Sequence, residues 1–168
     1  MITAVKTDAV VLERAYAVCR AIARREAKNF YYAFVALPKP RRNAICAIYA
    51  FMRKADDLAD DESRSREQRR KDLGQWVSEW HKAASGEATG DLVFIAVRDA
   101  VERFAIPARL LDELVSGTAM DLELDAGKTP DTYATFDDLY RYCYLVASVV
   151  GLVVVLPIGG GFASGRKA

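Results

Sequence analysis

The sequence predicts an all-α fold in a single domain, and three observations carry that prediction. Apolar residues recur at steps of three and four along nearly the whole chain, which is the spacing of one helix face, and no convincing alternation indicates strands. Glycine and proline punctuate these periodic segments at positions where helices begin or end. The 168 residues, 52% of them hydrophobic, are enough to bury a core and exclude a disordered chain.

The first predicted helix covers about residues 8–27, and an aromatic segment follows it. Within the predicted helix at residues 8–27, apolar side chains repeat at helical steps, at Val11, Ala15 and Val18. The aromatic segment at residues 30–34 reads Phe-Tyr-Tyr-Ala-Phe and ends shortly before a proline.

A second helix is predicted at about residues 41–58. Pro40 suits its first turn, where a missing amide donor is harmless. Ile45, Ile48 and Met52 supply its apolar positions. From residue 60 to residue 71 almost every residue is charged, and a run of this kind is usually a solvated connection.

Turn signals divide the rest of the chain. Gly86 and Gly90 flank one turn, Pro107 fits a helix start, and residues 126–130 have the composition of another turn. Further helices are therefore expected at residues 66–84, 91–104 and 107–124, and from Thr135 or Asp137 to about residue 156.

Charge and hydropathy limit the partners and the compartment. A net charge of +1 gives no electrostatic reason to expect nucleic acid as a partner. The first twelve residues lack the continuous apolar region of a signal peptide. The longest apolar stretch, at residues 145–158, is shorter than the ~20 residues that a membrane-spanning helix needs. We expect a cytoplasmic protein and leave peripheral contact with a membrane open.

The cysteines and the histidine do not form a recognisable site. Cys19, Cys46 and Cys143 are odd in number, far apart and surrounded by apolar or aromatic neighbours. This pattern argues against a disulfide framework or a zinc site and predicts three buried, reduced thiols. With His81 as its single histidine, the chain offers no His-rich metal site.

Four residues form the most unusual pattern, a stripe along one helix face. Tyr49, Arg53, Asp56 and Asp60 follow one another at steps of four, three and four. Two carboxylates ~6 Å apart repel by roughly 3 kcal/mol at an effective dielectric of ~20. A cation would offset this repulsion, and magnesium is bound in proteins through one or two carboxylates together with substrate phosphates. Arg53, one turn earlier, could hold a phosphate oxygen.

The same carboxylates also allow a structural explanation. They could belong to a helix end that runs into solvent, because charge clusters are commonly just solvated. Asp57 and Asp61 lie off the stripe and are expected to be supporting or surface residues. Spacing alone leaves both interpretations open.

The residues around the stripe resemble a known family. The aromatic segment at residues 30–34 and the stretch at residues 47–60, AIYAFMRKADDLAD, closely resemble the squalene/phytoene synthase family. Residues 140–151, YRYCYLVASVVG, are similar to its second signature, and Met120-Asp121-Leu122 matches its mid-chain pattern. The likeness covers about residues 15–152 and has the character of bacterial enzymes that make presqualene diphosphate or squalene.

This resemblance implies an all-α class I isoprenoid synthase fold, with helices around a deep apolar cavity. Members join two prenyl diphosphates head to head through a cyclopropylcarbinyl diphosphate. Magnesium held by two facing aspartate-rich motifs draws off diphosphate and leaves an allylic cation. Heterolysis needs positive charge at the leaving group, and the cation must be kept from water.

The resemblance also implies roles for the charged residues. Asp56 and Asp60 match the first magnesium-binding motif. Arg53 matches a diphosphate-binding arginine, and Lys28 would contact the other diphosphate. A solvated lysine is the alternative for Lys28. Asp121 has either a functional role or a hydrogen-bonding role at a bend between helices.

Tyrosines and apolar residues complete the implied site. Tyr49 and Tyr142 match tyrosines near the reacting carbons, although Tyr142 could equally be a packing residue. Aromatic residues at helical spacing usually belong to the hydrophobic core. A plain core role is therefore the alternative for the residues expected to line the prenyl cavity. The implied lining of the prenyl cavity is Phe30, Phe34, Val146 and Val149.

The end of the chain departs from the family pattern. The family's second aspartate-rich motif follows the Tyr-Cys-Tyr helix by several turns, and nothing here matches it. We therefore expect residues 1–152 to be the N-terminal part of the family's bundle and residues 153–168 to be a divergent, glycine-rich tail of a truncated chain.

Two functions remain in competition. The first is a magnesium-dependent prenyltransferase that condenses two farnesyl or geranylgeranyl diphosphates to presqualene diphosphate, squalene or phytoene, with NADPH needed only for squalene. The second is a non-catalytic fragment that binds prenyl diphosphate weakly or serves as a helical interaction module. Because opposing metal ligands are missing, little or no activity is expected of this chain alone. Its oligomeric state is left open.

Overall fold

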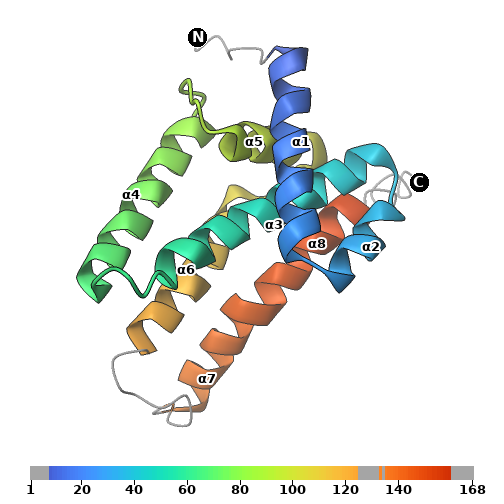
Figure 1. Cartoon of the computed structure of the whole chain (residues 1–168). Helices are drawn as coiled ribbons and strands as arrows, with labels where there is room; N and C mark the ends of the chain where they lie inside the picture. Colours follow the sequence, from blue (N-terminus) through green and yellow to red (C-terminus); the bar gives the residue numbers. More distant parts are fainter. Residues whose placement is uncertain (1–7, 125–132, 134, 160–168) are drawn as a thin grey trace.

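The computed structural model describes residues 8–124, 133 and 135–159, which form a bundle of helices joined by short loops (Figure 1). The all-α prediction is confirmed. In chain order the elements are α1 (Ala9–Glu26), α2 (Asn29–Val35), α3 (Lys39–Ala59), α4 (Arg66–Ala84), α5 (Leu92–Phe104), α6 (Ala108–Leu124), α7 (Phe136–Cys143), a π-helical segment (Tyr144–Ser148) and α8 (Val149–Gly159).

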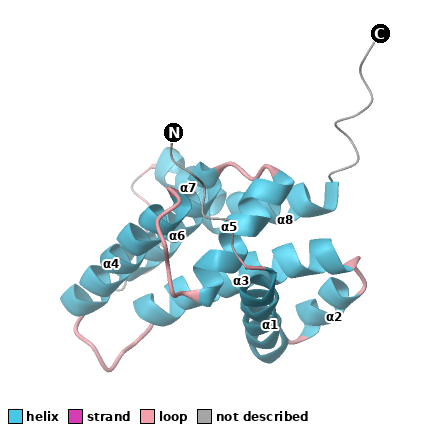
Figure 2. Cartoon of the chain, turned by 90° about the horizontal axis from the view of Figure 1, so that it is seen from above, coloured by secondary structure: helices cyan, strands magenta, loops and turns pink. Residues whose placement is uncertain are grey.

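Helix α3 lies in the middle of the bundle. It packs against α1, α2, α4, α5, α6 and α8. Figures 1 and 2 show it between α1 and α6 in two perpendicular views. The middle of α3 is therefore buried, and its two ends approach the surface on different sides of the bundle.

Small side chains allow α1 and α3 to pack closely. Ala15, Cys19 and Ala23 on α1 have no exposed surface, and neither do Ala47 and Ala50 on α3. Residues of this size let two helix backbones approach without leaving voids. This close packing fixes the direction of α3, on which the predicted carboxylate stripe lies.

Four aromatic rings form the centre of the core. Phe51 on α3 lies 4.6 Å from the ring of Trp76 and 5.2 Å from that of Trp80, both on α4. Phe94 on α5 completes the cluster, 5.7 Å from Trp80. Tilted and edge-on pairs at these distances are favourable beyond the apolar area they bury. The cluster joins α3, α4 and α5.

Side-chain caps explain why several helices begin where the sequence predicts. Ser65 accepts a hydrogen bond from the Gln68 amide at the start of α4, and Asp91 accepts one from the Val93 amide at the start of α5. Thr135 and Asp138 form a capping box at the start of α7. These caps satisfy amides that have no partner within the helix.

The structure differs from the predicted elements in two places. The aromatic segment at residues 30–34 forms a short helix of its own, α2. The last predicted helix is divided by the π-helical segment, where α6 comes very close. A Cβ atom on Gly117 of α6 would lie 3.3 Å from the Leu145 carbonyl oxygen, so the glycine permits this approach. Local spacing does not reveal such a contact.

The prediction of three buried thiols is wrong for Cys143. Cys19 and Cys46 are buried in the core, and burial raises the pKa of their thiols to about 12 and about 11. Cys143 is exposed, because it ends α7, a helix with no buried residue. Its aromatic neighbours in the sequence do not cover it.

The domain division expected after Leu152 falls inside α8. That helix continues to Gly159, and Val153 on it is fully buried in the core. Residues 160–168 of the expected tail and the turn expected at residues 126–130 lie outside the described residues. None of the described helices is long and apolar enough to cross a membrane.

Candidate functional site

The predicted stripe lies along the last turns of α3. Asp56 is half-buried, and Asp60 is the exposed residue that caps the helix. The Thr118 hydroxyl of α6 donates a hydrogen bond of 3.0 Å to Asp56 Oδ1. This contact holds the Asp56 carboxylate between α3 and α6, so it is not part of a helix end that runs freely into solvent.

The electrostatic environment of Asp56 fits a bound cation. Burial raises the pKa of the Asp56 carboxyl, the hydrogen bond from Thr118 opposes that rise, and the nearby negative charge of Asp60 adds to it. Asp56 has no ion-pair partner among the described residues. A hard cation that prefers oxygen ligands would relieve both the burial and the repulsion, so the donor set fits magnesium.

The described side chains supply only part of a complete metal site. Within residues 8–124, 133 and 135–159, no group of three or more His, Cys, Asp or Glu side chains could hold a metal ion. Asp121 belongs to α6, the helix of Thr118, but its side chain lies outside the described ones. Asp56 and Asp60 are thus the carboxylates that the structure offers for this role.

Arg53 is held one turn before the carboxylates. Its Nη2 lies 2.7 Å from Asp57 Oδ1, and its Nε lies 4.0 Å from Glu26 Oε2 at the end of α1. The Nε atom is buried and makes no hydrogen bond. Asp57 therefore orients Arg53, and the part of the guanidinium that stays accessible, on a side chain 40% exposed, can donate to an additional oxygen atom.

Lys28 lies at the junction of α1 and α2 in a strained conformation. Its φ of 44° is in the left-handed region, which a residue with a side chain adopts at a cost on the order of 1–3 kcal/mol. It lines a cavity of about 460 Å³ together with Arg24, Tyr31, Tyr32 and others. Two cations on one cavity wall suit a diphosphate.

Arg24 and Thr118 are the contributors that sequence reasoning missed. Arg24 precedes Lys28 by four residues, a helical spacing that could have suggested a shared face. For Thr118 no local signal exists, because it meets Asp56 across 62 positions of sequence.

Two of the predicted aromatic residues lie together. Phe34 on α2 packs edge-on against Tyr49 on α3, with ring centroids 6.2 Å apart and an angle of 60° between the ring planes. Burial raises the pKa of the Tyr49 hydroxyl, which therefore stays protonated. Phe30, by contrast, is 74% exposed.

The remaining predicted residues lie in the last helices. Tyr142 on α7 is half-buried, and its ring lies 5.4 Å from that of Tyr133. Val149, at the start of α8, is fully buried among the core residues. The side chain of Val146 lies outside those that the structure describes. The catalytic and cavity-lining roles of these residues stay predictions.

Comparison with known proteins identifies relatives over most of the chain. A profile of the squalene/phytoene synthase family matches residues 23–161, which include every site residue discussed above. The 15-cis-phytoene synthase of Synechococcus elongatus is 34% identical over 142 residues, covering 84% of this chain and 44% of that protein. The chloroplastic phytoene synthase 3 of Zea mays is also 34% identical, over 94% of this chain and 35% of that protein.

Solved structures show the same likeness in three dimensions. A squalene synthase, HpnC of Alicyclobacillus acidocaldarius, superposes with a TM-score of 0.75 at 28% identity, over 90% of this chain and 54% of that one. A dehydrosqualene synthase solved in complex with a ligand superposes with a TM-score of 0.70 at 27% identity, over 87% of this chain and 48% of that one. The chain spans about half the length, or less, of these relatives.

Proposed function

Since this chain belongs to the squalene/phytoene synthase family, we propose that it serves a head-to-head prenyltransferase reaction in isoprenoid biosynthesis, with two prenyl diphosphates as substrates. The observation that carries the proposal is the half-buried Asp56 carboxylate, whose pKa is raised by burial and by the charge of Asp60 and which forms no ion pair among the described residues. A half-buried carboxylate beside a second negative charge lowers stability unless a cation binds to it.

Asp56 and Asp60 would hold magnesium, which supplies positive charge to the departing diphosphate. Arg53, whose side chain is 40% exposed, binds an oxygen of that diphosphate through its guanidinium, and its bond to Asp57 fixes the direction of that group. Lys28 and Arg24 bind the diphosphate of the second substrate in the cavity between α1 and α2.

The aromatic pair protects the reacting carbon. Tyr49 precedes the carboxylates on the same helix face, and Phe34 shields its ring from one side. The faces of aromatic rings stabilise positive charge, and the apolar surface excludes water that would trap an allylic cation. Tyr142 and the valines of the last helices would extend this wall.

Binding without turnover is the second candidate function. It is favoured by the small number of carboxylates at the stripe, since the described residues place only Asp56 and Asp60 there and hold no group of three metal-ligating side chains. Both candidates require the same contacts of diphosphate with Arg53, Lys28 and magnesium. They differ in whether product forms.

A turnover assay with matched variants separates the candidates. The purified chain is incubated with magnesium and farnesyl or geranylgeranyl diphosphate, with and without NADPH, and lipid products are identified by mass spectrometry. Turnover that is lost in both Asp56→Ala and Asp60→Ala, but kept in Asp61→Ala, supports the enzyme. Asp61 is a suitable control because it bonds only within the loop after α3 and to Arg64.

Calorimetry with a non-hydrolysable prenyl thiodiphosphate tests the binding alternative. Magnesium-dependent binding without product supports the second candidate. Binding that is unchanged in Asp56→Ala contradicts the metal assignment, and the absence of both binding and product contradicts both candidates.

A further inference from the structure

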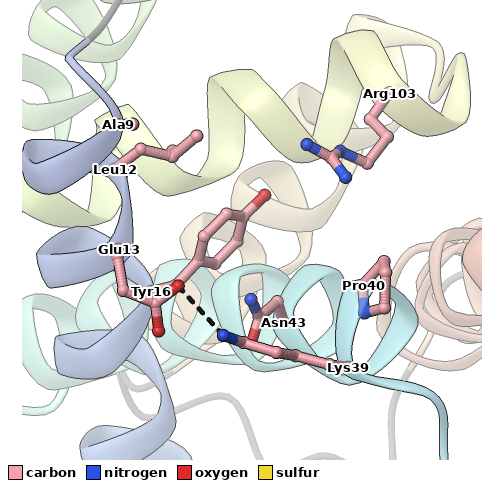
Figure 3. A pocket seen from close by; sticks show the side chains of 8 residues that line it. All are labelled: Ala9, Leu12, Glu13, Tyr16, Lys39, Pro40, Asn43 and Arg103. Atoms are coloured by element: carbon pink, nitrogen blue, oxygen red, sulfur yellow. Dashed lines mark ion pairs between the residues drawn. The ribbon is translucent and has the colours of Figure 1, made fainter.

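A second pocket lies at the opposite end of α3, between α1, α3 and α5 (Figure 3). Its volume is about 220 Å³, and its polar lining comes from Glu13 and Tyr16 on α1, Lys39 and Asn43 on α3, and Arg103 on α5. Asn43 and Asp56 are separated by about 20 Å along the helix axis at a rise of ~1.5 Å per residue. The pocket is therefore distinct from the carboxylate stripe.

Asn43 is a buried polar side chain with a donor left over. Only 6% of its surface is exposed. Arg20 Nη1 donates a hydrogen bond of 2.8 Å to its Oδ1, which orients the side-chain amide. The Nδ2 group makes no hydrogen bond to any of the described residues, and Figure 3 shows the side chain among the others that line the pocket. Nδ2 is not one of the fully buried unpartnered atoms among the described residues, so water or a ligand in the pocket can reach this donor and accept its hydrogen bond.

The carboxylates near the pocket already have partners. Glu13 pairs with Lys39 at 3.3 Å and with Arg20 at 3.1 Å. Asp99, just behind the lining, accepts a hydrogen bond of 2.5 Å from the Tyr16 hydroxyl and lies 3.4 Å from Arg103 Nε.

The cations around this pocket are Arg20, Lys39 and Arg103, against the two carboxylates of Glu13 and Asp99. The surplus charge is positive, and the unpaired N–H donor of Asn43 also favours a negatively charged or electron-rich ligand atom. The pocket therefore favours an anion.

The start of α3 strengthens this preference. The residue that caps it is Pro38, which makes no side-chain hydrogen bond to the helix, and no acidic residue lies in the first turn. Basic residues lie there instead, at Lys39, Arg41 and Arg42. The positive end of the helix dipole is thus not balanced by any side chain of the first turn, which is the condition under which a helix start binds anions.

We infer that this pocket binds a phosphate-class oxyanion, held by Asn43 Nδ2, Lys39 and Arg103. These donors come from two helices, Asn43 and Lys39 from α3 and Arg103 from α5, and all three residues line the same space. A tetrahedral anion with acceptors on all sides suits this arrangement better than a planar carboxylate does. Inorganic phosphate and free diphosphate share this chemistry, and both are small enough for the pocket volume.

The side-chain amides of the chain offer a direct readout. The sequence contains two asparagines, Asn29 and Asn43, and two glutamines, Gln68 and Gln75. Their NH₂ groups give few signals in a ¹⁵N–¹H correlation spectrum, and an Asn43→Ser variant assigns that of Asn43. We expect millimolar sodium phosphate, at constant ionic strength, to shift the Asn43 signal saturably and to leave that of Gln75 unchanged.

Separate titrations with phosphate, diphosphate and acetate identify the anion. A stronger response to phosphate or diphosphate supports the inference and shows which of the two fits better. An Asn43 signal that responds equally to acetate, or to none of the three, overturns it. The readout requires neither magnesium nor turnover, so failure here is independent of the proposed function.

Substitutions of the cations provide the second test. Arg103→Gln and Lys39→Gln should each weaken the phosphate response of the Asn43 signal at least tenfold. Arg109→Gln, which changes a largely exposed arginine on α6, should not. An unchanged response in both pocket variants overturns the assignment, and the spectrum itself reports whether each variant is folded.

Discussion

The two ends of α3 carry side-chain charges of opposite sign. At each end these charges have the same sign as the helix dipole there, which is unfavourable. The first turn holds basic residues and no acidic one, whereas the last turn holds Asp56 and Asp57 and no basic one. A stable helix usually has the reverse arrangement, since its start is positive and its end negative. Both ends of α3 would therefore gain stability from a ligand of opposite charge.

The ends differ in how far the protein itself balances their charges. At the start, Lys39 and Arg20 share Glu13, and what remains is one unpaired donor that faces the pocket and a small surplus of positive charge. At the end, Asp56 is half-buried with Thr118 as its hydrogen-bond partner and Asp60 as a repelling neighbour. The comparison indicates that the acidic end depends more strongly on a ligand than the basic end does.

The largest expected effect comes from the buried middle of α3, on which both ends depend. Phe51→Ala removes a fully buried ring from the aromatic cluster and should lower the free energy of unfolding by about 3–5 kcal/mol. Urea unfolding measures this loss. Phe30→Ala is the matched control, because that ring is 74% exposed and should matter little to stability. Equal losses in the two variants would contradict the assigned core.

At the acidic end, Asp56→Asn should change activity and stability in opposite directions. Loss of a charge-stabilising group should lower magnesium-dependent turnover on the order of 10²–10³-fold. Removing a buried negative charge while keeping an acceptor for Thr118 should raise the melting temperature, by roughly 2–4 °C for each kcal/mol relieved.

The sign of the pH dependence follows from the raised pKa of Asp56. Folding opposes ionisation of this group, so its penalty is absent below the ordinary Asp pKa of ~3.9 and grows as the pH rises through the folded value. The stability advantage of Asp56→Asn should therefore be present at neutral pH and vanish in acid. Melting curves at several pH values, without metal, measure this difference, and an advantage that grows in acid would show that the assigned cause is wrong.

A smaller effect is expected from Arg53→Lys, which tests the diphosphate contact beside the carboxylates. Lysine keeps the charge and can still pair with Asp57, but it lacks the planar guanidinium that can donate to Asp57 and to a diphosphate oxygen at once. We expect about tenfold weaker binding of a prenyl thiodiphosphate in calorimetry, which corresponds to ~1.4 kcal/mol. Lys54→Arg is the control, since it keeps the ion pair with Asp91. Similar affinities in both variants would show that the Arg53 guanidinium makes no contact with the diphosphate.

The smallest effect is expected at the basic end. Arg41→Glu places a negative charge in the first turn of α3 outside the pocket lining and should raise stability by about 0.3–1 kcal/mol at low salt. Arg41→Gln should give about half of this gain, and salt should reduce both. A destabilised Arg41→Glu variant would contradict the view that the dipole at this end is unbalanced.

Local patterns in the sequence were sufficient for the helices themselves. The predicted helix at residues 66–84 matches α4 (Arg66–Ala84), because Ser65 caps it and its apolar residues follow the helical repeat. The stripe from Tyr49 to Asp60 could likewise be placed on one helix, since steps of three and four are a property of the α-helix alone. Capping and periodicity depend only on neighbours within a few residues.

Contacts between distant segments were beyond such patterns. The sequence did not reveal that Thr118 bonds Asp56, that Arg24 and Lys28 share a cavity, or that Gly117 lies against a π-helical turn. The exposure of Cys143 was missed for the same reason, because burial depends on what packs against α7 and not on the residues beside the cysteine.

The amino-acid order therefore accounts for the all-α class, for the family and for the single helix that carries Arg53, Asp56 and Asp60. Spacing alone left two interpretations of those aspartates, a solvated helix end or a metal-binding motif. Packing of α6 against α3 favours the second, since it half-buries Asp56 and raises its pKa. Burial and charge pairing arise from side chains that meet only when the bundle forms, and they determine which charges on α3 the protein itself leaves unbalanced.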